Sequence, residues 1–238
     1  MTALPIDPVL PKLMQALADA GRAVLQAPPG AGKTTRVPLA MLDAGLTDGK
    51  IIMLEPRRLA ARAAAERLAE GLGEAPGQTV GYRMRGDSKP GQRIEVVTEG
   101  ILTRMLQDAP DLPGIGAVLF DEFHERSLNA DLGLALCLEV AEVLRDDLIL
   151  LAMSATLDAA PAAQVMGAPI LTPAGQSLAG TPQFLPKPLP KTTRFETALA
   201  DLIPPALGEA EGSPLALLPG EGEIRRTRAG ARRVGKEW

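Results

Sequence analysis

The stretch that most constrains this chain is Ala27–Thr35, which reads APPGAGKTT. It fits the phosphate-binding pattern G-x-x-x-x-G-K-[ST], with Ala27 in place of the first glycine. Gly30 and Gly32 allow the backbone to curl so that successive N–H groups point at one anion, with no Cβ in the way. The pattern therefore predicts a loop that binds the phosphates of a nucleotide.

Each residue type in this loop has its own expected role. Lys33 would bring a positive charge to the β- and γ-phosphates, and the Thr34 hydroxyl would ligate Mg²⁺. The expected nucleotide-binding set is Gly30, Ala31, Gly32, Lys33, Thr34 and Thr35. The alternative is a glycine-rich turn without a ligand, and an acidic motif further along the chain counts against it.

The sequence around the loop supplies the context that such a motif needs, a strand before it and a helix after it. Residues 23–26 form a short apolar run typical of a buried strand. A helix is expected from about Lys33 to Leu42, with Pro38 within about its first turn, where a missing N–H is tolerated. The positive end of that helix dipole would add to the phosphate site.

Apolar runs alternate with helical periodicity over the first 170 residues. Strands are predicted at 51–54, 79–84, 94–98, 117–120 and 148–153, and helices at 7–20, 59–72, 101–106 and 131–144. The turn-rich GDSKPGQ separates the second and third of these strands. This alternation predicts an α/β fold with a mostly parallel sheet flanked by helices. The polar motifs follow strand ends, where open α/β sheets bind ligands.

An acidic pair follows the strand predicted at 117–120. Asp121 is placed to hold Mg²⁺, and Glu122 to hold the metal or to polarise an attacking water as a general base. His124, the only histidine of the chain, completes DEFH. We group His124 with the catalytic candidates Lys33, Asp121 and Glu122, but favour for it a coupling role, bridging the nucleotide site to a neighbouring domain, over acid–base chemistry.

Composition excludes several classes of protein. Hydrophobic residues make up 46% of the 238, yet no apolar run approaches the roughly 18 residues of a membrane span. The N-terminus lacks the features of a signal peptide, and the single cysteine, Cys137, cannot form an internal disulfide. No cluster of His and Cys predicts a zinc site. We expect a cytoplasmic protein without a membrane partner.

The net charge of −4 gives no overall attraction for nucleic acid, but the charge is uneven. The segment from Glu223 to Trp238 carries six basic residues and two acidic ones. A nucleic-acid surface in the rest of the chain must therefore be a local patch.

Six motifs occur in a fixed order: APPGAGKTT, EPRRLAA, TEG, DEFHERS, SAT and LLPGEGEI. The set resembles the DEAH-box group of superfamily 2 ATP-dependent helicases, and DEFH, with Phe in the third place, is similar to the bacterial HrpB type. The resemblance covers about Leu4 to Arg226. It implies paired RecA-like P-loop α/β domains that bind ATP and Mg²⁺ in their cleft and single-stranded RNA across both, with DNA as an open alternative.

The resemblance also implies roles for residues outside the phosphate loop. The metal would lie at Thr34, Asp121 and Glu122. The nucleic-acid backbone would contact Arg57, Arg58 and Thr98, because guanidinium and hydroxyl groups bind phosphates without reading sequence. The alternative to a nucleic-acid contact is that the two arginines only lie exposed to solvent at the start of a helix. The residues that couple hydrolysis to strand movement would be Ser154 and Thr156.

The domain organisation predicted from these motifs has three parts. Residues 1–170 form the RecA-like ATP-binding domain, 171–224 a linker and the start of an incomplete second domain, and 225–238 a basic tail unlike the family. Within the second part we expect a helix at 194–207, ended or broken by Pro204 and Pro205, and a short strand at 215–218.

The resemblance implies a second RecA-like domain with a Q-x-x-G-R-x-G-R helix whose arginines reach the γ-phosphate. This motif and the others expected of that domain do not occur in the sequence. We therefore expect this chain to bind ATP or ADP but to hydrolyse ATP and unwind nucleic acid weakly, unless a partner lends the missing arginines. The second hypothesis is an ATP- and nucleic-acid-binding module without helicase activity of its own. A third, a P-loop ATPase unrelated to nucleic acid, is disfavoured by EPRR, TEG and SAT.

Overall fold

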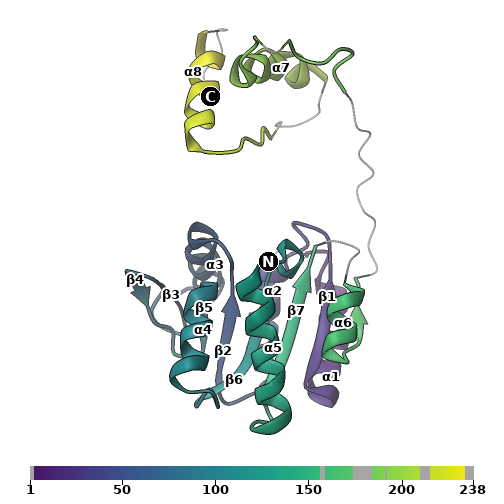
Figure 1. Cartoon of the computed structure of the whole chain (residues 1–238), viewed down its shortest axis with the longest axis vertical. Coiled ribbons are helices and arrows are strands. Elements are labelled where there is room, and N and C mark those ends of the chain that lie inside the picture. The colour runs from purple at the N-terminus through teal and green to yellow at the C-terminus, as the bar shows by residue number, and fades with distance from the viewer. Residues whose placement is uncertain (1–2, 156–158, 174–183, 191, 210–214, 234–238) are drawn as a thin grey trace. The chain divides into compact units, whose positions relative to one another are not determined.

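The computed structural model describes residues 3–155, 159–173, 184–190, 192–209 and 215–233. The chain divides into two compact units, Met1–Leu178 and Ala179–Trp238, and the helices and strands of both are labelled in Figure 1.

An eight-stranded sheet runs through the first unit in the order β4-β3-β5-β2-β6-β7-β1-β8. The strands are β1 Arg22–Gln26, β2 Lys50–Leu54, β3 Val80–Met84, β4 Asp87–Lys89, β5 Ile94–Val97, β6 Ile115–Phe120, β7 Ile149–Ser154 and β8 Ile170–Leu171. All neighbouring strands are parallel except β3 and β4. The apolar runs of β6 and β7 are buried along their whole length, as central strands of a parallel sheet require.

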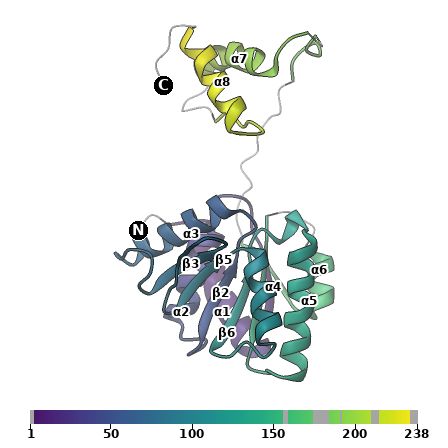
Figure 2. The ribbon, with the colours of Figure 1, turned by 60° about the vertical axis from the view of Figure 1, so that its left-hand side comes forward.

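Helices cover both faces of this sheet (Figures 1 and 2). They are α1 Leu10–Ala20, α2 Lys33–Asp43, α3 Arg58–Gly71, α4 Glu99–Asp108, α5 Leu128–Val143 and α6 Ala160–Met166, with 3-10 turns η1 Asp7–Val9 and η2 Phe123–Glu125. One hydrophobic cluster lies under α1, α2 and α3 and includes Leu17, Met41 and Leu68. A second lies under α4, α5 and α6 and includes Leu102, Cys137 and Met166. The predicted mostly parallel α/β fold is confirmed.

Two local details of this unit differ from the prediction. The segment predicted as a turn between β3 and β5 contains the short strand β4, which pairs antiparallel with β3 in a hairpin. Its polar sequence DSK carries no strand signal, since β4 is held by backbone pairing at the edge of the sheet. Pro38 lies in the interior of α2, beyond the first turn, where its buried ring packs in the core.

The second unit contains α7 Phe195–Glu209 and α8 Glu221–Arg233. The predicted break at Pro204 and Pro205 is wrong, because α7 continues through both prolines. Helix α7 packs closely against α8: a Cβ placed on Gly230 would lie 3.3 Å from the Cβ of Ala200. An ion pair joins Arg226 of α8 to Glu196 of α7, with Nε and Oε1 2.6 Å apart.

The strand predicted at 215–218 is also wrong. These residues are irregular, and no strand lies among the described residues of the second unit to pair with them. Helix α8 itself was not predicted, since its sequence carries few apolar residues, and it runs across the boundary expected at Ile224. Among the described residues no helix has both the length and the apolar character needed to cross a bilayer.

Candidate nucleotide site

The phosphate loop connects β1 to α2 at the carboxyl edge of the sheet, in the strand–loop–helix context that the motif requires. Gly30 has φ 76° and Gly32 has φ 98°, a region that favours glycine. Gly32 has a second reason to lack a side chain, because a Cβ there would lie 2.6 Å from Leu4 Cδ1. The two glycines therefore set both the curl of the loop and the close approach of the N-terminal segment.

That N-terminal segment braces the loop from one side. The Ile6 N–H donates to the Ala31 carbonyl at 3.1 Å. The Asp7 carboxylate accepts from the Leu4 N–H at 2.8 Å, and its Oδ1 lies 3.5 Å from Nε of Arg36 on α2. The sequence motif gave no sign of this support, which joins residues on both sides of the loop.

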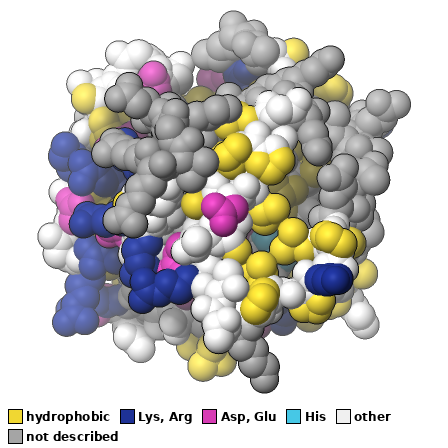
Figure 3. Space-filling view, turned by 90° about the horizontal axis from the view of Figure 1, so that it is seen from above, with side chains coloured by type: hydrophobic (Ala, Val, Ile, Leu, Met, Phe, Trp, Pro, Cys, Tyr) yellow, Lys and Arg dark blue, Asp and Glu magenta, His cyan; other side chains and the backbone are white. Residues whose placement is uncertain are grey.

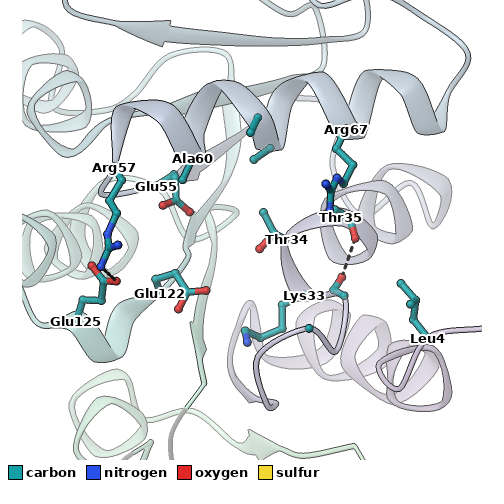
Figure 4. Close-up of a pocket in the computed structure, with 14 residues that line it drawn as sticks. Leu4, Lys33, Thr34, Thr35, Glu55, Arg57, Ala60, Arg67, Glu122 and Glu125 are labelled. Carbon is teal, nitrogen blue, oxygen red and sulfur yellow. Dashed lines mark hydrogen bonds and ion pairs between the residues drawn. The ribbon is translucent and has the colours of Figure 1, made fainter. Parts of the chain in front are cut away.

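A cavity of about 560 Å³ opens beside the loop (Figure 4). Its lining comes from the N-terminal segment, the phosphate loop, the end of β2, one face of α3 and the segment after β6. The residues are Leu4, Gly30, Gly32, Lys33, Thr34, Thr35, Glu55, Arg57, Ala60, Ala63, Ala64, Arg67, Glu122 and Glu125. These five segments, drawn from the first 125 residues of the chain, thus meet around one space of nucleotide size.

Lys33 is buried, with 4% of its surface exposed. Its Nζ donates to the Ala27 carbonyl at 2.8 Å and to the Pro28 carbonyl at 3.4 Å. The Lys33 ammonium group is therefore held by two neutral carbonyl oxygens. A phosphate oxygen can take their place and form a stronger, charge-assisted hydrogen bond.

Thr34 and Asp121, predicted to share the metal, lie together. The Thr34 hydroxyl donates to Asp121 Oδ2 at 2.5 Å, and Asp121 Oδ1 accepts from the Glu122 N–H at 2.9 Å. Burial raises the pKa of Asp121 above its ordinary value, and the Thr34 hydrogen bond opposes that rise. A hydroxyl beside a carboxylate is the hard-oxygen donor pair that Mg²⁺ takes.

The rest of the donor set fits Mg²⁺ as well. No group of three or more His, Cys, Asp and Glu side chains that could hold a metal occurs among the described residues. Mg²⁺ is ordinarily held by one or two carboxylates together with phosphates and water, so it needs no such cluster. These residues fit an ion that arrives with a nucleotide.

Glu122 reaches the cavity from a strained turn. Its φ is 49° and that of Arg126 is 48°, so two non-glycine residues in the left-handed region flank the 3-10 turn η2. Such residues cost of order 1 kcal/mol each and cluster at functional sites. The strain turns the chain sharply after β6 and places the Glu122 carboxylate among the residues that line the cavity.

His124 joins the acidic motif to the segment after β7. Its Nε2 lies 3.4 Å from Glu122 Oε2, and its Nδ1 accepts from the Ala155 N–H at 3.2 Å. The Ser154 carbonyl, one residue earlier, accepts from the Ala27 N–H at 3.0 Å. The contacts of His124 thus lie within the first unit, between the catalytic candidate Glu122 and the SAT motif. Thr156, the last residue of that motif, lies outside the described residues.

Glu55, directly after β2, is a further carboxyl group of the cavity, and the sequence motifs did not predict its role. It is 4% exposed. Burial, followed by the charge of Asp121, raises the pKa of Glu55 to about 7, although the Arg57 N–H lowers it by hydrogen bonding. A carboxyl group half-protonated near neutral pH therefore lies beside the proposed catalytic pair.

The three predicted nucleic-acid residues lie in different surroundings. Arg57 Nη2 is 2.7 Å from Glu125 Oε1 at the rim of the cavity. Arg58 instead donates to the Arg85 carbonyl at 3.0 Å, at the turn between β3 and β4. Thr98 is half-buried and precedes the first turn of α4.

Exposed cations gather around α3 and the β3–β4 turn, where they form a local basic patch. They are Arg57, Arg58, Arg62, Arg85 and Lys89. Lys and Arg side chains are coloured dark blue in Figure 3, which includes those of both units. Carboxylates lie among these cations, since Arg57 pairs with Glu125 and Arg62 with Glu66 and Asp87.

The DEFHERS motif contacts every other motif of the first unit through a different residue. Asp121 contacts Thr34, Glu125 contacts Arg57 and His124 contacts Ala155. The fourth contact is made by Ser127, whose hydroxyl donates to Glu99 Oε1 of TEG at 2.5 Å.

Several cavity and motif residues were not found from the sequence. They are Leu4, Glu55, Arg67, Glu125 and Ser127. The available signal was that the motif continues beyond DEFH as ERS, and that α3 carries Ala60, Ala63, Ala64 and Arg67 on one helical face.

Comparison with known proteins gives consistent matches. The DEAD/DEAH box helicase family model matches residues 9–165. The chain is 52% identical over 241 residues to the ATP-dependent RNA helicase HrpB of Escherichia coli K12, covering all of this chain and 30% of the relative. It is 37% identical over 163 residues to human ATP-dependent RNA helicase DHX30, covering 65% of this chain and 14% of that protein.

Solved structures agree with the family match. The crystal structure of Escherichia coli DEAH/RHA helicase HrpB superposes with a TM-score of 0.91 and 51% identity, over 98% of this chain and 30% of that chain. A second structure, of Escherichia coli DExH-box NTPase HrpB, gives a TM-score of 0.81. The chain spans under a third of the length of these relatives. On its sequence, its fold and the arrangement of its motifs, the chain belongs to the DEAD/DEAH box helicase family.

Proposed function

We propose that this chain is the ATP-binding part of an ATP-dependent helicase that couples ATP hydrolysis to translocation on nucleic acid or to its unwinding. The observation that carries the proposal is that Lys33, Thr34 and Glu122 line one cavity, beside which Asp121 accepts a hydrogen bond from Thr34. Phosphoryl transfer needs positioning and charge stabilisation more than covalent chemistry from the protein, and this set supplies both.

Each side chain has a role in that proposal. The loop N–H groups and Lys33 bind the phosphates, while Thr34 and Asp121, with Glu122 nearby, hold Mg²⁺. The ion, when bound, neutralises phosphate charge. Glu122 orients the attacking water and accepts its proton. His124 holds Glu122 and the SAT segment together, so we assign it to positioning and coupling.

Single-stranded RNA is the proposed nucleic acid, with DNA as the alternative. Two relatives, HrpB of Escherichia coli and human DHX30, are named ATP-dependent RNA helicases, and the basic patch beside α3 can bind the backbone of either polymer. Arg57, Arg58 and Thr98 are the proposed contacts, and Ser154 and Thr156 the proposed coupling residues.

We propose that turnover by this chain alone is weak. The arginines that would complete the active site are expected from a second RecA-like domain, and we find no such motif in 171–224 or in the basic tail 225–238. An arginine supplied to the transferred phosphoryl group is worth about 10³ to 10⁵ in rate. A partner that lends these arginines would restore activity.

ATP hydrolysis by the purified chain, with and without single-stranded RNA, tests the proposal. We expect ATP or ADP binding, slow turnover and no nucleotide binding by Lys33→Ala. A Lys12→Ala variant, changed at an exposed position on α1, is the matched control and should bind like the wild type.

Two other outcomes carry specific meanings. Rapid RNA-stimulated turnover by the chain alone would contradict the weak-activity proposal. Nucleotide and RNA binding with no turnover at all would favour the second candidate, a binding module without helicase activity of its own. Nucleotide binding by Lys33→Ala as strong as that of the wild type would overturn the assignment of the site.

A further inference from the structure

An ion pair links the EPRR and DEFHERS motifs at one end of the cavity (Figure 4). Arg57 Nη2 and Glu125 Oε1 are 2.7 Å apart, and 68 residues separate them in the sequence. The Arg57 side chain is 72% exposed and that of Glu125 33% exposed. Exposed ion pairs contribute little stability, so a second anion can take Arg57 from Glu125 at low cost.

We infer that Arg57 is shared between the nucleotide cavity and bound nucleic acid, so that a backbone phosphate and Glu125 compete for its guanidinium. The inference rests on the proposed function, which places nucleic acid at Arg57. Glu125 then acts as a positioning residue: it holds Arg57 at the cavity without touching either ligand's reacting atoms.

The charges that line the cavity determine whether bound nucleotide strengthens or weakens the binding of nucleic acid. The charged lining residues are Lys33, Arg57, Arg67, Glu55, Glu122 and Glu125. With Glu55 counted as ionised, their formal charges balance while Arg57 is paired at the rim. Withdrawal of Arg57 to a backbone phosphate leaves one negative charge in excess, facing an anionic nucleotide. Nucleotide and nucleic acid therefore weaken each other's binding, by the same factor in both directions.

The structure offers a matched control on the same segment. Arg126 and Asp131 also form an ion pair, with Nη2 and Oδ2 3.0 Å apart and both side chains exposed. Neither Arg126 nor Asp131 lines the cavity. Asp131→Asn removes one carboxylate charge from an equivalent pair just as Glu125→Gln does, and leaves Arg57 paired.

The experiment measures the affinity of the whole chain for a fluorescein-labelled oligouridylate by anisotropy, without nucleotide and with saturating Mg²⁺·ADP. In the wild type we expect ADP to weaken RNA binding about fivefold, within the usual range of such couplings. In Glu125→Gln, RNA binds severalfold more tightly than to the wild type, and the effect of ADP falls to less than twofold. Asp131→Asn matches the wild type.

A double-variant cycle separates sharing of Arg57 from a general change of charge. Arg57→Ala binds RNA more weakly and lowers the slope of log affinity against log salt by about one. Adding Glu125→Gln to Arg57→Ala then leaves RNA affinity unchanged, because no guanidinium remains to be shared. Circular dichroism of each variant shows that the fold is kept.

The outcomes distinguish this inference from the proposed function. Absence of RNA binding by the wild type contradicts this inference and also RNA as the nucleic acid of the proposed function. RNA binding by the wild type, with Glu125→Gln behaving like Asp131→Asn, contradicts the sharing of Arg57 alone. An equal gain from Glu125→Gln in the Arg57→Ala background also overturns it, since the gain is then independent of Arg57.

Discussion

At the scale of single residues, the site is governed by how its carboxyl groups are distributed. Asp121 has a hydroxyl and an N–H as partners, and Glu122 has His124 nearby. Burial raises the pKa of Glu55, as do its acidic neighbours Asp121, Glu122 and Glu125, and among the described residues only the Arg57 N–H opposes the rise by hydrogen bonding. Its charge state therefore depends on whatever binds in the cavity.

Glu55 predicts a pH dependence of stability. Folding raises the pKa of Glu55 from 4.5 to about 7. The folded chain thus holds the proton more tightly than the unfolded chain does, and its free energy of unfolding falls as the pH rises from about 4.5 to about 7. Glu55→Gln removes this loss and is more stable than the wild type above pH 7, by up to about 3 kcal/mol at about 1.4 kcal/mol per pKa unit.

Urea denaturation at several pH values, without Mg²⁺ or nucleotide, measures the difference between the two chains. Glu70→Gln, at an exposed position on α3, is the control and should follow the wild type. If Glu55→Gln and the wild type keep a constant difference across this window, the pKa of Glu55 is not raised by folding.

At the scale of elements, the start of α5 carries two roles on one residue. The Ser127 hydroxyl accepts from the Ala130 N–H at 2.9 Å as the N-cap, and it donates to Glu99 of the TEG motif. The helix cap is thus tied to the preceding helix, α4, which begins at Glu99. Loss of the hydroxyl affects both helices.

Ser127→Ala should lower the free energy of unfolding by about 1 kcal/mol, the usual cost of removing an N-cap, and by somewhat more if the bond to Glu99 contributes. Ser127→Thr keeps a hydroxyl and should retain most of the stability. Urea midpoints of the three chains provide the comparison. An alanine variant as stable as the wild type would show that α5 does not depend on this cap.

Elements differ in how far the sequence predicts them, and the reason is where their stability comes from. Buried strands such as β6 and β7 carry their own signal, because apolar side chains fill both faces. The hairpin strand β4 and helix α7, with its two prolines, depend on their neighbours instead. Backbone pairing and helix packing override local propensity in both.

The residues of the site also differ in how far the sequence predicts their positions. The phosphate loop and Asp121–Glu122 follow strand ends of one sheet, so their meeting could be predicted from the order of motifs. The pairing of Arg57 with Glu125 could not, since it depends on the strained turn after β6. Leu4 and Arg67 reach the cavity only through the packing of the N-terminal segment and α3.

At the scale of the whole molecule, every residue that lines the cavity belongs to the unit Met1–Leu178. A chain that ends at Pro173 should therefore bind ADP within about threefold of the full chain, since it retains all described strands of the sheet. Titration with a fluorescent ADP analogue measures this, with Lys33→Ala in the shortened chain as the negative control. Loss of binding by a shortened chain that keeps its circular dichroism spectrum would assign part of the site to the second unit.

The order of strands in the sheet places the three motifs that follow β1, β6 and β7 next to one another. Strand β7, which ends at Ser154, lies between β1, which leads into the phosphate loop, and β6, which leads into the acidic motif. Adjacent strands are about 4.8 Å apart. The phosphate loop and the acidic motif each share a hydrogen bond with the SAT segment, so we expect a shift of either one to move this segment without a rearrangement of the core.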